Sequence, residues 1–158
     1  MRSADHRAFT LVEVLVVVVV LGILAAIVIV LVKPSGEDTR KSSLFTQLKI
    51  IRSSLQRYHL HHNSVYPTLA QLQANWDVIT QKTLTDGTVD TNGEHGPYLK
   101  TPPINSFELS STVEAVGGAG PAVGWIYDAI SGNITGVVEL GRAQDAELDT
   151  SPTDVTTY

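Results

Sequence analysis

The stretch of sequence that decides the fold is residues 8–26, which read AFTLVEVLVVVVVLGILAA. From Val14 to Val32 every side chain is Val, Leu, Ile, Ala or Gly, and no residue is charged. At a rise of about 1.5 Å per residue, roughly 20 such residues cross the apolar core of a bilayer, which is about 30 Å thick. The pattern therefore predicts a membrane-spanning helix in this part of the chain.

Two ordinary explanations compete for this segment. A secretory signal peptide has an apolar stretch of about 7–15 residues that ends at a small-residue cleavage site. Here the stretch is longer, and Ala25-Ala26 is followed by more Ile and Val. A plain anchor for an exported domain explains the composition, but it gains nothing from Glu13. Because a carboxylate costs about 2.5–3.5 kcal/mol at the bilayer centre and less near its edge, an acid in such a span indicates a function.

Residues 8–13 (AFTLVE), with the apolar run behind them, resemble the type IV prepilin signature, which defines type IV pilins and type II secretion pseudopilins. The resemblance implies that a prepilin peptidase removes a leader, residues 1–8, by cutting between Ala8 and Phe9. It also implies N-methylation of Phe9, and pairing of Glu13 with the amino terminus of a neighbouring subunit. Two positions depart from the pattern: Ala8 stands where Gly is usual, and Val30 where many members have Pro.

The same resemblance implies a location and a set of partners. A transmembrane and polymerisation helix over residues 9–33 would cross the bacterial inner membrane once, in contact with lipid. The N-terminus would be cytoplasmic and the C-terminal domain periplasmic or part of an extracytoplasmic filament. The partners would be further copies of the chain in a homo-oligomeric filament, the prepilin peptidase, and an inner-membrane assembly platform with a cytoplasmic ATPase.

Gly22 and Ala26 have the small-xxx-small spacing that lets membrane helices approach closely. Gly and Ala are also common in membrane spans without any such role. Helix packing and plain composition therefore remain equally open for this pair.

Residues 34–140 are expected to form the exported domain. Pro34 removes a backbone donor and disfavours helix in the residue before it, so a helix break is expected there. Beyond it, apolar side chains recur at spacings of three and four residues, which predicts an amphipathic helix that needs a sheet to cover its stripe. The stripe consists of Leu44, Leu48, Ile51, Leu55 and Tyr58.

The end of this helix carries His59, His61 and His62. Three neighbouring imidazoles could indicate a metal site, but no acid lies nearby and the spacing is not one helical turn. A solvated helix end, where His favours the negative end of the helix dipole, is the preferred interpretation.

Thr68 and Gln71 predict a capping box at the start of a short helix, and residues 77–101 look loop-like. Tyr66-Pro67, Gly96-Pro97-Tyr98-Leu99 and residues 102–105 (PPIN) resemble the connection found in major pseudopilins. Ser106 stands where that family has a second Pro, and the Trp that often follows is missing.

Three strands are expected, at 107–116, 123–128 and 134–140, separated by Gly-rich and Ser-Gly-Asn turns. They predict an α+β fold, in which the long N-terminal helix packs on a small antiparallel sheet. Residues 141–158 are acidic, rich in Thr and poor in large apolar groups, which predicts a disordered tail. Asp145, Glu147 and Asp149 in that tail could offer calcium ligands, although a solvated acidic tail fits the composition better.

Charge and motifs exclude several function classes. A net charge of −5 is the wrong sign for a nucleic-acid binder, and the chain has no cysteine for a disulfide or a thiolate metal site. The sequence contains no nucleophile-elbow, P-loop, dinucleotide-binding or zinc-protease motif, so no enzyme activity, cofactor or resident metal is expected.

The sequence thus predicts a structural subunit of a filament, of the type II secretion pseudopilus kind. A surface type IV pilus subunit, used for adhesion, motility or DNA uptake, is the nearest alternative, and the absence of cysteine weighs against it. A membrane-anchored exported enzyme or binding module is the alternative from another class.

Overall fold

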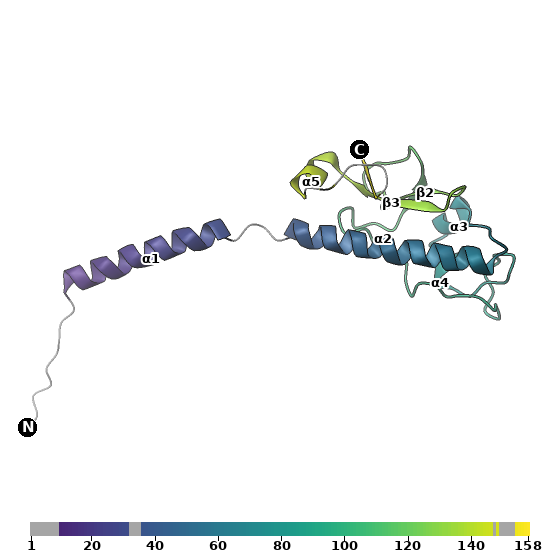
Figure 1. The fold of residues 1–158 in the computed structure, drawn as a ribbon, viewed down its shortest axis with the longest axis horizontal. Helices are drawn as coiled ribbons and strands as arrows, with labels where there is room; N and C mark the ends of the chain where they lie inside the picture. The colour runs from purple at the N-terminus through teal and green to yellow at the C-terminus, as the bar shows by residue number, and fades with distance from the viewer. Residues whose placement is uncertain (1–9, 32–35, 147, 149–153) are drawn as a thin grey trace, which may run out of the picture. The chain divides into compact units, whose positions relative to one another are not determined.

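The structure is a computed structural model that describes residues 10–31, 36–146, 148 and 154–158, without the side chains of 27–31 and 145. The chain divides into two compact units, residues 1–35 and 36–158 (Figure 1). In the first unit, helix α1 (Leu11–Leu31) coincides with most of the predicted apolar run. The second unit contains the other eight elements that the structure describes.

Helix α2 (Gly36–His61) is the amphipathic helix that the spacing predicted. All five side chains of its predicted stripe are buried, so the period of three and four residues correctly identified the core face. In Figure 1 the sheet lies along one side of this helix, and strand β3 supplies most of the contact. Leu44 marks this close packing, since a methyl group added at Gly136 of β3 would lie 2.7 Å from it.

Two short helices follow the long one. The predicted capping box begins α3 (Leu69–Gln73): Thr68 accepts from the Gln71 N–H, and the Gln71 side chain accepts from the Thr68 N–H. Helix α4 (Asp77–Thr80) lies where the sequence predicted a loop. The rest of that segment is irregular as expected, and it is held by bridges from Thr83 to Val89 and to His95.

The sheet has four strands in the order β1-β2-β3-β4. Strands β1 (Val113–Ala115), β2 (Trp125–Asp128) and β3 (Asn133–Val138) lie close to the three predicted ranges. The fold class is therefore confirmed as α+β, but the sheet is mixed: β2 and β3 are antiparallel, whereas β1 and β2 are parallel. Because these strands are so short, residues 116–124 suffice to return the chain to the same end of the sheet.

The prediction of a disordered tail over 141–158 needs correction for the residues that the structure describes. Leu140–Asp145 form helix α5, and Val155–Thr157 form strand β4, which pairs in parallel with β3. The tail also places four apolar side chains in the core: Ala143, Ala146, Leu148 and Val155. These residues are too few and too widely spaced in the sequence to form a recognisable apolar pattern. Pairing of β4 with β3 stabilises this part of the chain instead.

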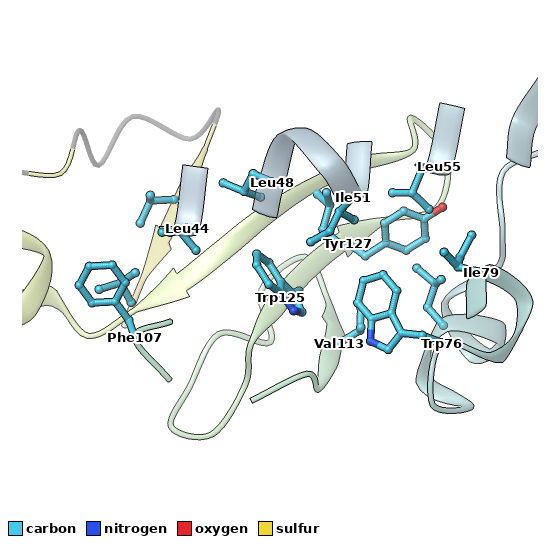
Figure 2. Packing of buried hydrophobic residues seen from close by; sticks show 14 of the residues in the cluster. Leu44, Leu48, Ile51, Leu55, Trp76, Ile79, Phe107, Val113, Trp125 and Tyr127 are labelled. Carbon is cyan, nitrogen blue, oxygen red and sulfur yellow. The ribbon is translucent and has the colours of Figure 1, made fainter. Parts of the chain in front are cut away.

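The core lies between the stripe of α2 and the sheet. Figure 2 shows Leu48 and Ile51 opposite Trp125 and Tyr127 of β2, with Trp76 beside Val113. The polar atoms of the buried aromatics are satisfied, as burial requires. The indole of Trp125 donates to the Pro103 carbonyl at 3.0 Å, and the Tyr127 hydroxyl donates to the Pro67 carbonyl at 2.9 Å. The loops that cover the core are thereby fixed to the sheet.

Candidate assembly site

The predicted processing residues, Ala8 and Phe9, lie outside the described residues. The next predicted site residue, Glu13, lies in the first turn of α1. Its Oε2 atom accepts hydrogen bonds from the backbone N–H and the hydroxyl of Thr10, both at 3.0 Å. The Thr10 hydroxyl in turn accepts from the Glu13 N–H at 3.3 Å. This reciprocal arrangement is a capping box, so Glu13 has a role within its own helix.

The capping box leaves the charge of Glu13 without compensation by a cation among the described residues. Hydrogen bonds to Thr10 satisfy two backbone donors at the helix start, and the carboxylate favours the positive end of the helix dipole. Both hydrogen bonds that the carboxylate accepts use one oxygen, Oε2. A cation brought by another molecule could therefore bind Oε1 without breaking the cap.

The remaining surface of α1 is apolar and exposed. The described side chains from Leu11 to Ala26 are all exposed. Gly22 and Ala26 are four residues apart and lie on one face, and no described atom comes within 4 Å of a methyl group placed on Gly22. The face is therefore open to another helix. In the described part of the chain, no helix reaches the length and apolarity needed to cross a membrane.

The structure offers no support for a metal site in the described residues. No three His, Asp or Glu side chains there are arranged to hold an ion. Of the three acids considered for calcium, Glu147 and Asp149 lie outside the described residues, and the side chain of Asp145 is not described.

His62 is buried, which corrects the prediction of a solvated helix end. Its Nδ1 lies 2.7 Å from the Tyr58 carbonyl and must donate, so Nε2 accepts from the Thr83 hydroxyl at 2.9 Å. The ring stacks on Tyr58, with 3.8 Å between ring centroids. Burial lowers the pKa of His62, and the neighbouring His95 adds to this effect, although the hydrogen bond to Tyr58 opposes it. His62 thus holds the 83–95 loop against the end of α2 as a neutral side chain.

Asn105 is fully buried, and its role was not predicted from the sequence. Its amide donates to the carbonyls of Gly124 and Val137 at 2.7 and 2.8 Å, and its Oδ1 accepts from the Phe107 N–H at 2.7 Å. Ser106, which stands in place of the expected Pro, donates to the Arg40 carbonyl of α2 at 2.8 Å. The 102–106 segment therefore connects the helix to the sheet. An Asn within a Pro-rich segment was the signal that could have revealed this role.

A capped apolar helix with an acid in its first turn, together with a separate unit of one long helix and a small sheet, defines the class of type IV pilin-like proteins. The comparisons with known proteins agree. Residues 4–29 match the family model described as the prokaryotic N-terminal methylation motif. No solved structure matches the chain significantly.

Curated relatives from several bacteria resemble the chain, and they share the name type II secretion system core protein G. The relative from Pseudomonas aeruginosa is 31% identical over 148 residues, which cover 94% of this chain and 96% of that protein. The Vibrio cholerae relative is 38% identical over 103 residues, or 65% and 66% of the two chains. The match to Klebsiella michiganensis is 37% over 75 residues, and it spans about half the length of that relative, 52%. The chain belongs to the family of type II secretion system core protein G.

Proposed function

We propose that this chain is a structural subunit of an extracytoplasmic type IV pilus-like filament, the pseudopilus of a type II secretion system that exports proteins. The observation that carries the proposal is the 31% identity to core protein G over 94% of the chain, joined to an N-terminal methylation motif over residues 4–29. The family and the absence of catalytic motifs make the protein a structural component rather than an enzyme.

The methylation motif supports a specific maturation route. Prepilin peptidase cuts between Ala8 and Phe9 and methylates the new amino group. The precursor is anchored in the bacterial inner membrane by residues 9–33, with its N-terminus cytoplasmic and its C-terminal domain periplasmic. An assembly platform with a cytoplasmic ATPase then moves subunits from the membrane into the filament.

In the proposed assembly step, the Phe9 amino group of one subunit pairs with Glu13 of its neighbour. Each pair neutralises two charges that are costly to leave alone in an apolar environment. The contact joins two different surfaces, and such a contact gives an open helix when its rotation does not close. The exposed Gly22 and Ala26 allow close approach of the α1 helices of neighbouring subunits.

Mass spectrometry of the protein extracted from membranes tests the maturation step. We expect a chain that begins with N-methyl-Phe9. An intact N-terminus in cells with active prepilin peptidase would falsify the assignment to this class.

Two substitutions at Glu13 separate the assembly role from the capping role seen in the structure. Glu13→Gln keeps an acceptor for the Thr10 N–H but removes the charge, whereas Glu13→Val removes both. If the intersubunit ion pair drives assembly, both variants should be cleaved and inserted but absent from filaments. If Glu13 only caps its own helix, Glu13→Gln should polymerise like the wild type and only Glu13→Val should fail. Filament incorporation is followed by shearing and electron microscopy.

A further inference from the structure

An open groove runs between α2 and the 99–104 segment. It has a volume of about 360 Å³. Its apolar lining includes side chains that remain half exposed, Ile50 at 50% and Ile104 at 53%, while Gln47 and Thr101 add polar groups. Ile51, Leu99, Pro102 and Pro103 complete its apolar part, and Lys100 places a positive charge at its side. We call this the Ile104 groove. Covering exposed apolar side chains of this kind with a partner removes apolar surface from water, which favours binding.

A complementary projection lies in the turn between β2 and β3, residues 128–132, which we call the Ile130 turn. Ile130 is 94% exposed, more than any other large apolar side chain in the described residues. The turn is rigid, because Asp128 accepts from the Ile130 N–H at 2.9 Å and from the Ser131 hydroxyl at 2.6 Å. Gly132 has a φ of +70° and packs so closely against the Tyr66 ring that a β-carbon at this position would collide with the ring. The apolar tip is therefore held in place before any partner arrives.

The Ile130 turn also carries the charge opposite to that of the groove. The hydrogen bonds from the Ser131 hydroxyl and the Ile130 N–H lower the pKa of Asp128, so its carboxylate is ionised at neutral pH. An apolar tip next to an anion matches an apolar groove next to Lys100. Apolar and charge complementarity thus favour the same pairing.

The two surfaces are displaced along α2. The Ile104 groove includes Ile50, whereas the Ile130 turn contacts Tyr66, whose ring packs on His59 with 4.2 Å between centroids. Nine residues separate Ile50 from His59, which corresponds to about 14 Å along the helix axis. A contact between two different surfaces of the same chain leaves one of each surface free on a pair of subunits, so further subunits can add, and it gives an open filament when its rotation does not close.

We infer that the Ile130 turn of one subunit inserts into the Ile104 groove of a second copy of this chain, so that Ile130 packs between Ile50 and Ile104 while Asp128 pairs with Lys100. This contact rests on the proposed filament function and adds to it an interface between the C-terminal units. A second copy is the favoured occupant because the groove and its complement occur on the same chain, in equal number in any homopolymer.

Disulfide crosslinking of the full-length chain tests the contact in membranes that supply prepilin peptidase and the assembly platform. The chain has no cysteine, so every crosslink comes from the introduced residues. A disulfide needs Cβ atoms about 3.5–4.5 Å apart. The test variant carries Ile130→Cys with Ile104→Cys. The control carries Val116→Cys with Ile104→Cys, since Val116 is also apolar and 74% exposed. All variants are examined for filaments by electron microscopy.

We expect a ladder of dimers, trimers and longer products from the test variant, at a yield about tenfold above that of the control. Lys100→Glu in the test background should lower the yield several-fold, whereas Lys100→Arg should preserve it. Filaments without a ladder above the control level would overturn the groove contact and leave the filament function standing. If the wild-type chain forms no filaments, the proposed function and this contact both fall.

Discussion

Asn105 offers a stringent test of how the connection between helix and sheet is stabilised. The side chain is fully buried; its NH2 group acts as a donor and its Oδ1 atom as an acceptor. The amide donates to two carbonyls, those of Gly124 and Val137, while Oδ1 accepts from the Phe107 N–H. No other amino acid of similar size provides two donors and an acceptor in this arrangement. We therefore expect Asn105→Ala and Asn105→Asp to destabilise the fold by different mechanisms.

The expected size of the effect follows from the hydrogen bonds that are lost. Asn105→Ala removes three bonds of 2.7–2.8 Å. Each buried bond contributes about 1 kcal/mol, and a buried group left unsatisfied costs about 1–3 kcal/mol. The Gly124 carbonyl still accepts from the Val137 N–H at 3.0 Å, so its loss is smaller. The total is roughly 3–5 kcal/mol, which corresponds to a urea midpoint about 2 M lower.

Asn105→Asp should be worse than Asn105→Ala at neutral pH, because it places a buried carboxylate against two carbonyl oxygens. Burial, together with the two carbonyl oxygens that face the second carboxylate oxygen, favours the protonated acid in the folded state, and the protonated acid can donate one hydrogen bond. The stability of the Asn105→Asp variant relative to wild type should therefore be highest at low pH and fall as pH rises from about 4 to 7.

Urea unfolding of a fragment covering residues 36–158, the second compact unit, measures these effects by circular dichroism. Asn92→Ala serves as the control, since Asn92 is exposed in a turn and should change stability by less than about 0.5 kcal/mol. An Asn105→Asp variant as stable as wild type at pH 7, or one whose loss of stability does not change with pH, would contradict this role of Asn105.

Three further predictions concern other parts of the second unit. Burial lowers the pKa of His62, so the stabilisation of the fold by the neutral side chain is fully present above the ordinary pKa of histidine and is lost as pH falls below it. His62→Gln should therefore flatten this part of a plot of the free energy of unfolding against pH. Asp154→Asn should cost about 1 kcal/mol by urea unfolding, since it weakens the 2.6 Å ion pair between Asp154, the residue before β4, and Arg52 of α2, where both side chains are partly exposed. A fragment of residues 36–141 should lose the cooperative unfolding of the fragment 36–158, because burial of Leu148 and Val155 alone contributes roughly 3–6 kcal/mol. Equal urea midpoints for the two fragments would contradict the placement of the tail in the core.

The elements that the sequence predicted well are those whose signal is local. The stripe of α2 depends only on the helical period, and all five of its members are buried as expected. The capping box of Thr68 and Gln71 depends on two residues three apart, and its hydrogen bonds are present. The Ser-Gly-Asn turn correctly marked the antiparallel pairing of β2 with β3. In each case one short window of sequence contains all the interacting groups.

Strand β4 could not be predicted in this way, because its partner is distant in sequence. Only Val155 among its three residues is both apolar and buried, so the strand has no hydrophobic signature of its own. Its stability comes from pairing with β3 and from the ion pair of Asp154 with Arg52, which are 102 residues apart. An acidic, Thr-rich composition describes both a solvated tail and a short strand covering a sheet edge. Composition therefore could not distinguish them.

The candidate site shows the same division. The acid in the apolar run was recognisable because a charge there is expensive. The hydrogen bonds of Glu13 to Thr10 were not foreseen, although a Thr followed three residues later by Glu is the pattern of a capping box. His62 and Asn105 were missed because their partners, Thr83 and Gly124, come together only in the folded chain.

In the proposed pathway the exposed apolar surface of α1 accounts for contact with lipid, but it does not by itself explain assembly. In water, burying about ten Val and Leu side chains at roughly 1.5–3 kcal/mol each would give a large driving force. In the proposed pathway the subunit leaves a bilayer whose lipid tails are as apolar as those side chains, so most of this free energy is already realised before assembly. The difference between membrane and filament must then come from close packing and from polar groups. Glu13 is the only charged residue of the α1 helix, and in the proposed assembly its cation comes from a neighbouring subunit. A vertical shift between neighbours costs little along a uniform run of valines but separates this carboxylate from its cation. Polymerisation should therefore depend far more on Glu13 than on any single apolar residue of the helix.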